Sequence, residues 1–249
     1  YMPTHLTLEF APGAMLVSGQ PLLRTLIGGT VNAAYRQQIF APSPQQPNID
    51  ITVSGLTAHV HVGCAPGSPC TTHDFLVGDR FFISGSTRPG LNGGHVVTAV
   101  KDVYDFSFVL LHSPANRTEG GQPKLSIASF YFVWEAFPGQ NLFRAQAGKQ
   151  QWVTPEFWGA FDSVENGDST VAVQSSIDSC AATVLFISPY RVTRISIEGS
   201  GRIIEGHGGS LSPMNNARPN PVQFVPPGTL NAVLEIKCDY SKIQNLAVS

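Results

Sequence analysis

The chain has 249 residues, of which 42% are hydrophobic and only 13% charged, and its net charge is −2 near neutral pH. This balance excludes the basic surface that binding to nucleic-acid phosphates requires, so no nucleic-acid partner is expected. No apolar run is long enough to cross a bilayer, and membrane insertion is not expected. The 24 glycines and 19 prolines are too many for long helices, so the composition predicts a β-rich fold.

The first part of the chain predicts several short strands. Residues 5–10 alternate between apolar and polar, and brief apolar stretches follow at residues 14–17 and 22–27. A Pro- and Gln-rich stretch beginning at Pro42 marks a boundary. We expect residues 1–44 to form lead-in β coils.

Residues 45–140 predict a small antiparallel β module. Short strands are separated by clusters of Gly, Pro and Asp, which are typical of turns in an antiparallel sheet. The expected strands cover residues 49–53, 57–62, 80–84, 95–100, 106–111 and 125–133.

Residues 141–249 predict one helix followed by short strands. The spacing of Val173, Ile177, Cys180 and Ala181 gives one apolar helical stripe, so the helix is expected over residues 170–182. Asp168 or Ser169 is expected to cap its N-terminus. Strands are expected at residues 184–187, 191–197, 202–204, 232–236 and 243–248, with a long loop over residues 206–228.

Several short motifs in this last region resemble one known family. The motifs are PEFWGA at residues 155–160, GDST at 167–170, AVQ at 172–174 and the strand VLFISP at 184–189. They are similar to the opening of the pectate-lyase-like right-handed parallel β-helix family, which includes phage tailspikes and polysaccharide depolymerases. The sequence differs from the family at Ser169, where a second Asp is usual, and this disfavours a calcium or catalytic role for the loop.

The resemblance implies an all-β fold. Residues 141–249 would be the capping helix and the first coils of a right-handed parallel β-helix, a solenoid, and residues 45–140 would interrupt it as an inserted module. Because the chain starts at Tyr1 and stops at Ser249 within an alternating apolar run, we expect it to be a truncated part of a longer polypeptide.

The resemblance also implies a function. We expect a phage tailspike-like or tail-fibre-like virion protein with a structural and host-attachment role, found in the virion tail or extracellularly. Its expected partners are two further copies in a homotrimer, other virion tail proteins and a host-surface polysaccharide. The alternative is a polysaccharide lyase or glycoside hydrolase, a depolymerase whose catalytic residues lie beyond this segment. No cofactor is expected.

One stretch of fifteen residues in the module contains five potential zinc ligands: His59, His61, Cys64, Cys70 and His73. However, the strand at residues 57–62 places His59 and His61 on the face opposite its valines, which is typical of solvent-facing side chains. A zinc site is therefore disfavoured, and no metal site is assigned. A Cys64–Cys70 disulfide is the favoured alternative in an oxidising environment.

Paired acids for glycoside cleavage are the other chemistry to consider. The candidate residues are Asp162, Glu165, Asp168 and Asp178, and the candidates for lyase chemistry are Arg191, Arg194, Arg202 and Glu205. We interpret Asp168 as a helix cap, Asp178 as part of a solvated helix face and the arginines as surface ion-pair residues. No catalytic residue is assigned.

Three further features have ordinary structural interpretations. The aromatic residues are interpreted as core rather than as a sugar-stacking platform. The tripeptide Asn116-Arg117-Thr118 is interpreted as a chance match to a glycosylation site, and residues 206–209 as a chain corner. The aromatic residues concerned are Trp134, Trp152, Phe157, Trp158 and Phe161.

Overall fold

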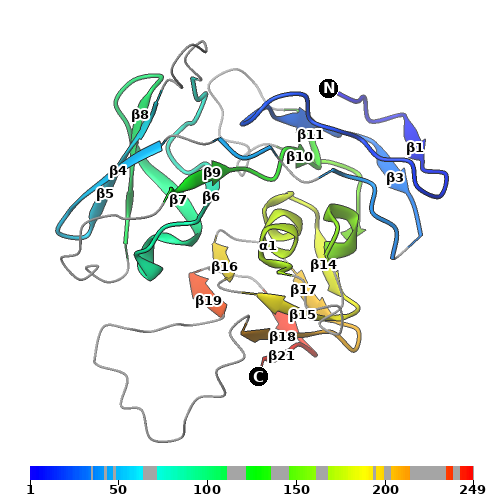
Figure 1. Ribbon diagram of the computed structural model, residues 1–249. Coiled ribbons are helices and arrows are strands. Elements are labelled where there is room, and N and C mark those ends of the chain that lie inside the picture. Colours follow the sequence, from blue (N-terminus) through cyan, green and yellow to red (C-terminus); the bar gives the residue numbers. More distant parts are fainter. Residues whose placement is uncertain are drawn as a thin grey trace, which may run out of the picture.

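The computed structural model describes residues 1–34, 36–41, 44–46, 49–63, 72–110, 122–135, 146–160, 168–192, 195–198, 203–213, 234–237 and 242–248. Within these ranges the fold is mostly β-sheet, as the composition predicts, with α1 (Thr170–Asp178) as the one α-helix. No helix in the described ranges is long and apolar enough to span a membrane. Figure 1 shows the antiparallel strands on one side of α1 and short parallel strands below it.

The module is a six-stranded antiparallel sheet in the order β4-β5-β8-β7-β6-β9. A short 3-10 helix, η1 (Pro89–Leu91), lies between the third and fourth of these strands along the chain. The strands are β4 (Ile49–Ser54), β5 (Thr57–Val62), β6 (Arg80–Ser84), β7 (Gly93–Val100), β8 (Asp105–Val109) and β9 (Lys124–Ser126).

The sheet curls around a core of its own. Gln46, just before β4, exchanges backbone hydrogen bonds of 2.7 and 3.0 Å with Leu125 of β9, so the two ends of the sheet meet. Alternate residues of β4, β5 and β8 point inward, and in β5 this matches the alternation that the sequence predicts. The enclosed core includes Val60, Phe81, Phe106 and Phe108.

The predicted single strand over residues 125–133 is wrong. Ser129 has a positive φ of 61°, which breaks the extended run after β9. The following strand, β10 (Phe130–Tyr131), leaves the antiparallel sheet and pairs in parallel with β2 (Thr25–Leu26). Next, β11 (Val133–Glu135) pairs with β12 (Gln146–Ala147) in an antiparallel ladder.

The lead-in residues form short parallel pairings. Strand β1 (Thr7–Glu9) pairs with β3 (Thr30–Asn32), and single parallel bridges join Met2 to Ile27 and Leu16 to Phe40. The three predicted apolar stretches are therefore present, although each contributes only a few paired residues.

The last part of the chain forms three parallel sheets. Their orders are β13-β14-β17-β20, β15-β18-β21 and β16-β19, so the chain adds one strand to each of three sheets before it returns to the first. The strands are β13 (Trp152–Val153), β14 (Thr183–Phe186), β15 (Pro189–Val192), β16 (Ile195–Glu198), β17 (Ile203–Gly206), β18 (Ser210–Pro213), β19 (Leu234–Lys237), β20 (Lys242–Gln244) and β21 (Ala247–Val248).

Three predicted elements in this region need correction. The single strand expected over residues 191–197 is wrong, because residues 191–192 belong to β15 and residues 195–197 to β16, and these strands are in different sheets. The loop expected over residues 206–228 contains β18, which pairs with β15 although its sequence Ser-Leu-Ser-Pro carries no strand pattern. The strand expected over residues 243–248 is divided into β20 and β21 at Asn245, whose φ is +56°. For β18, β20 and β21, pairing to a strand of the preceding passage decides the conformation.

Helix α1 begins where predicted and ends earlier. Ser169 occupies the N-cap position without a side-chain cap, while Asp168 Oδ1 accepts the backbone N–H of Thr170 at 2.9 Å. The helix ends at Asp178 rather than at residue 182, because Cys180 adopts the left-handed conformation with φ of 64°. A 3-10 helix, η3 (Pro155–Trp158), packs beside it and closes with Gly159 in the left-handed region.

The passages of parallel strands stack so closely that two glycines are required. A Cβ at Gly206 would overlap the carbonyl oxygen of Asn245, and one at Gly209 would overlap that of Phe186. Both contacts join consecutive passages of the chain, so the absence of a side chain sets their spacing.

We therefore expect Gly206→Ala to lower the free energy of unfolding by about 1–3 kcal/mol, because the neighbouring backbone must move to admit the methyl group. Gly19→Ala is the matched control, since a Cβ at Gly19 would meet nothing within 4 Å. Urea denaturation of the two variants measures the difference. Equal stability of the two variants would contradict this close stacking.

The module core contains a histidine whose environment disfavours protonation. His73 is 4% exposed, and its ring stacks on Phe75 and meets Phe106 edge-on at centroid distances of 5.2 and 5.0 Å. Its Nδ1 accepts the backbone N–H of Phe75 at 3.2 Å. Burial lowers the pKa of His73 below its usual value.

Because the pKa is lower in the folded than in the unfolded state, the unfolded chain binds the proton first as the pH falls below about 6.5. The free energy of unfolding should therefore decrease as the pH is lowered from neutral. His73→Asn, whose side-chain oxygen can still accept the Phe75 N–H, should make this decrease shallower in urea titrations at several pH values. His5→Asn changes an exposed histidine and should keep the wild-type slope.

Candidate functional site

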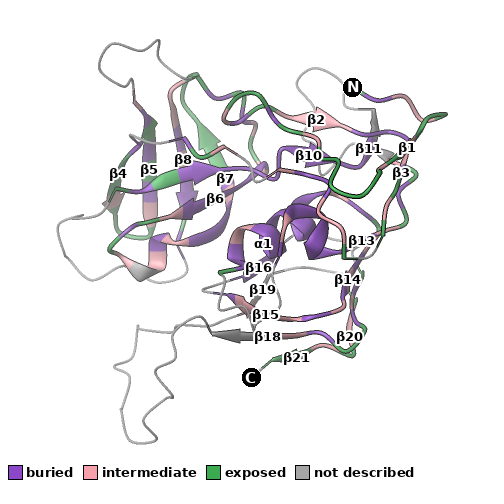
Figure 2. Cartoon of the chain, turned by 45° about the vertical axis from the view of Figure 1, so that its right-hand side comes forward, coloured by how far each residue is buried: buried purple, intermediate pink, exposed green. Residues whose placement is uncertain are grey.

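Helix α1 lies between the module and the parallel strands, and it is buried on nearly every side (Figure 2). Of its nine residues only Val171 is not classed as buried. One face carries the predicted apolar residues Val173 and Ile177, which join the core of the parallel strands. The opposite face is polar, and it is covered by the module rather than by water.

A buried ion pair joins this polar face to the module. Arg80 in β6 lies 3.1 Å from Asp178 Oδ1 at the end of α1, and the two side chains are 4% and 6% exposed. The interpretation of Asp178 as part of a solvated face is therefore wrong. Arg80 was not predicted as a partner of Asp178, although a charge at the start of the apolar strand Arg-Phe-Phe-Ile indicates that it needs a buried partner.

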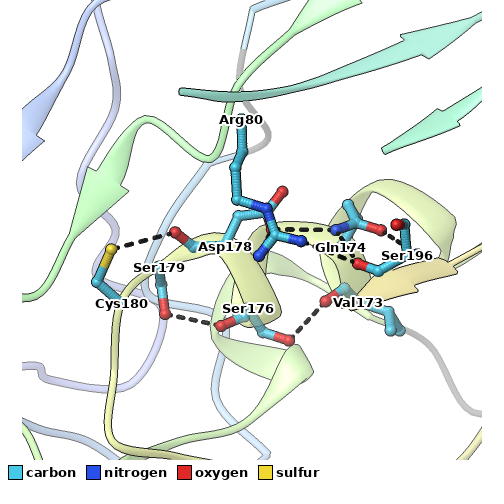
Figure 3. A network of polar contacts seen from close by, with 8 residues as sticks. All are labelled: Arg80, Val173, Gln174, Ser176, Asp178, Ser179, Cys180 and Ser196. Atoms are coloured by element: carbon cyan, nitrogen blue, oxygen red, sulfur yellow. Dashed lines mark hydrogen bonds and ion pairs between the residues drawn. The ribbon is translucent and has the colours of Figure 1, made fainter. Parts of the chain in front are cut away.

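The ion pair belongs to a larger polar network (Figure 3). Gln174 Nε2 donates to Asp178 Oδ1 at 3.1 Å and to the carbonyl oxygen of Ser196 at 2.9 Å. Gln174 Oε1 accepts the backbone N–H of Ser196 at 2.9 Å, and Arg80 donates to the same Ser196 carbonyl at 3.3 Å. The network thus connects β6 of the module, α1 and strand β16.

Strand β7 also packs closely against this network. A Cβ at Gly94 would lie 2.8 Å from the side-chain carbon of Gln174. The absence of a side chain at Gly94 therefore lets the module backbone approach α1 directly.

A second charge cluster joins the lead-in segment to the module. Arg24 lies 2.5 Å from the buried carboxylate of Asp79 and 3.4 Å from the exposed one of Asp74. The guanidinium also lies 5.4 Å from the ring centre of Phe75. Asp79 Oδ2 accepts the backbone N–H of Leu76 at 2.8 Å, so this carboxylate holds both a turn of the module and the lead-in.

A third buried acid lies beside the first parallel strands. Glu156 Oε1 accepts hydrogen bonds from the hydroxyls of Ser188 and Tyr190 at 2.9 and 2.8 Å. Burial, together with the Glu156 carboxylate, raises the pKa of Tyr190, so its hydroxyl remains a donor. Glu156 Oε2 has no hydrogen-bond partner among the described residues.

A small cleft lies between the module and the start of α1. Its volume is about 130 Å³, and the polar residues that line it include Ser84, Asn92, Asp168 and Thr170. Ligand pockets for small molecules usually measure about 300–1,000 Å³, so this cleft is too small for a sugar chain. Asp168 also accepts a hydrogen bond from the hydroxyl of Thr170, besides the one from its N–H.

The candidate catalytic acids do not come together in the described ranges. Asp178 is held by Arg80 and Asp168 by Thr170, while Asp162 and Glu165 lie outside the described residues. For lyase chemistry, Glu205 lies 3.4 Å from His207, and Arg191 is half-buried with its backbone oxygen bound to the N–H of Ser169. Arg194 and Arg202 lie outside the described residues.

The five potential zinc ligands are divided by the sheet. His59 and His61 are exposed on β5, as predicted, whereas His73 is inside the core. Cys64 and Cys70 lie outside the described residues, so their pairing stays a prediction. In the part of the chain that the structure describes, no group of three His, Cys, Asp or Glu side chains could hold a metal ion.

The aromatic residues of η3 belong to the core, as predicted. Phe157 and Trp158 are 0% and 2% exposed, and Trp158 Nε1 donates to the carbonyl oxygen of Ala128 at 3.2 Å. Trp152 is half-buried against this core. The side chain of Trp134 is not described, and Phe161 and Asn116 lie outside the described ranges.

The predicted corner at residues 206–209 is confirmed. The N–H groups of His207 and Gly209 both donate to the carbonyl oxygen of Phe186, at 2.8 and 3.1 Å. The chain turns here from β17 to β18.

Comparisons with known proteins add no relative. No protein-family model matches the chain, and neither the curated proteins nor the solved structures give a match.

The buried ion pair gives a direct prediction for stability. Arg80→Met leaves Asp178 as an uncompensated buried charge and should lower the free energy of unfolding by about 3–5 kcal/mol. The double variant Arg80→Met/Asp178→Leu replaces both charges by apolar groups and should recover most of that loss. Urea denaturation measures both variants.

Lys101→Met is the control, because Lys101 is 79% exposed and lies 3.6 Å from Asp105. Loss of this surface pair should change stability by less than about 1 kcal/mol. Wild-type stability of Arg80→Met would show that the network does not hold the module.

Proposed function

We propose that residues 141–249 form the start of a right-handed parallel β-helix of the pectate-lyase-like type, capped by α1. The observation that carries this proposal is the parallel pairing of successive passages in three separate sheets. Repeated addition of one strand to each sheet is how a solenoid buries its apolar positions. The right hand follows from the strong preference of parallel crossover connections.

The constant register of the strands supports the same proposal. Val184, Ile204 and Ile243 are aligned across β14, β17 and β20, and Tyr190 pairs with Leu211 across β15 and β18. Apolar residues thus stack on apolar residues from one passage to the next. Each such position would be exposed if its neighbouring passage were absent.

The contacts on both sides of the module support its interpretation as an insertion. The N–H groups of Ile39 and Phe40 both donate to the carbonyl oxygen of Phe157, at 3.1 and 2.8 Å. Segments before and after the module are therefore neighbours. Gln46 and Leu125 likewise bring the beginning and end of the module together. An insertion with adjacent ends leaves the surrounding fold undisturbed.

The function that agrees best with these features is structural and adhesive. The chain would be the proximal part of a tailspike-like or tail-fibre-like virion protein, acting as a homotrimer that contacts other tail proteins. Its wider β-helix would bind a host-surface polysaccharide. Arg80, Asp178 and Asp79 form buried ion pairs between parts of the chain and do not line an open cleft. This arrangement supports a structural role.

Sedimentation of the purified chain tests the assembly. A homotrimer should have about three times the 26.7 kDa mass of the chain. A monomer at micromolar concentration would contradict the trimer.

Incubation of the full-length polypeptide with bacterial surface polysaccharides tests attachment. We expect binding without release of reducing ends or unsaturated sugars. Release of either product would favour a depolymerase of the same fold instead, because the fold alone does not determine activity.

A further inference from the structure

The outer face of strand β5 carries two histidines that neither core uses. His59 and His61 alternate with the buried residues Ala58, Val60 and Val62, so both imidazoles face solvent. The Cα atoms of residues i and i+2 of a strand are about 7 Å apart, so the rings of His59 and His61 lie side by side on the same face.

Each histidine is held by the residue directly opposite on β8. His61 pairs with Asp105 across the ladder, and its Nδ1 lies 2.9 Å from the Asp105 carboxylate. His59 pairs with Ser107, and its Nδ1 lies 2.8 Å from the Ser107 hydroxyl. Both rings are therefore oriented by their Nδ1 atoms.

The partners decide which ring nitrogen can act as a ligand. An ionised carboxylate only accepts hydrogen bonds, so Nδ1 of His61 carries the hydrogen, and Nε2 of the neutral ring keeps a lone pair. The Ser107 hydroxyl can accept from His59 Nδ1 in the same way. A carboxylate or other acceptor on one ring nitrogen is the usual arrangement for a histidine whose other nitrogen binds a metal ion.

The surrounding charges favour a cation. Asp50 on β4 is directly opposite His61 on the other side, so carboxylates flank this histidine on both neighbouring strands. Lys101 lies 3.6 Å from the second carboxylate oxygen of Asp105 and offsets part of this negative charge. Asp50 is exposed and adds negative charge at the open edge of the row.

We infer that His59 and His61 bind a divalent transition-metal ion through their Nε2 atoms, with Asp105 and Ser107 orienting the two rings. Imidazole is a preferred ligand of Zn²⁺, Ni²⁺ and Cu²⁺. Metal–nitrogen distances of about 2.0–2.1 Å require the two Nε2 atoms to approach one ion, and both side chains are exposed on the same face of β5. Because the described residues contain no third protein ligand, water completes the coordination and binding is reversible.

Titration of the 249-residue chain with Ni²⁺, followed by calorimetry, tests the inference. We expect one ion per chain in the wild type. His59→Gln and His61→Gln should each weaken binding at least tenfold. Asp105→Asn keeps both ligands but loses the ionised acceptor, and it should weaken binding by about 10–100-fold.

His207→Gln is the matched control, because His207 is another exposed histidine and lies on a different part of the chain. Its affinity for Ni²⁺ should equal that of the wild type. Thermal unfolding in the presence of a chelator checks that each variant is folded.

Two results would overturn the inference. Equal Ni²⁺ affinity of the wild type and the His59→Gln/His61→Gln double variant would exclude these histidines as ligands. Loss of binding in Cys64→Ser/Cys70→Ser, with both histidines intact, would assign the ion to the cysteines instead. Retention of binding in that cysteine variant would support the two-histidine site.

Discussion

The fold depends on one buried contact, the ion pair between Arg80 and Asp178. Transfer of either charge from water to the interior costs several kcal/mol, and their attraction offsets this cost only when the remaining hydrogen-bonding positions are filled. Here Gln174 and the Ser196 carbonyl fill them. Because these groups come from β6, α1 and β16, the hydrogen bonds are complete only when the module, the helix and the parallel strands are in their observed positions.

The second charge cluster gives the module another fixed point. Arg24 reaches Asp79 from the lead-in segment, while Arg80, the next residue of the same strand region, reaches Asp178. Two neighbouring positions in the chain thus bind to different parts of the protein. A module held at both points cannot rotate without leaving at least one buried charge unpaired. The free-energy cost of that unpaired charge disfavours every other orientation of the module.

Local pattern explains which features the sequence predicts well. The alternation of β5 predicts the exposed faces of His59 and His61, and the stripe of Val173 and Ile177 predicts the helix. The same method misplaces Asp178, because a polar helix face predicts water and carries no sign of a covering sheet. It also misses β18, since the hydrogen bonds that make Ser-Leu-Ser-Pro a strand come from β15, twenty-one residues earlier by the register Pro189 to Ser210. Long-range pairing decides both cases.

The position of the module follows from two separate constraints. Its ends are adjacent, because Gln46 pairs with Leu125 and the N–H of Phe40 donates to the carbonyl oxygen of Phe157, so the insertion proposed above would have little entropic cost for the surrounding fold. Adjacent ends alone would leave the module free to swing on its connections. The buried charges of Arg24, Asp79, Arg80 and Asp178 remove that freedom. A module whose ends are adjacent and whose orientation is fixed by buried ion pairs is suited to hold a surface, such as the outer face of β5, at a fixed angle to the parallel strands.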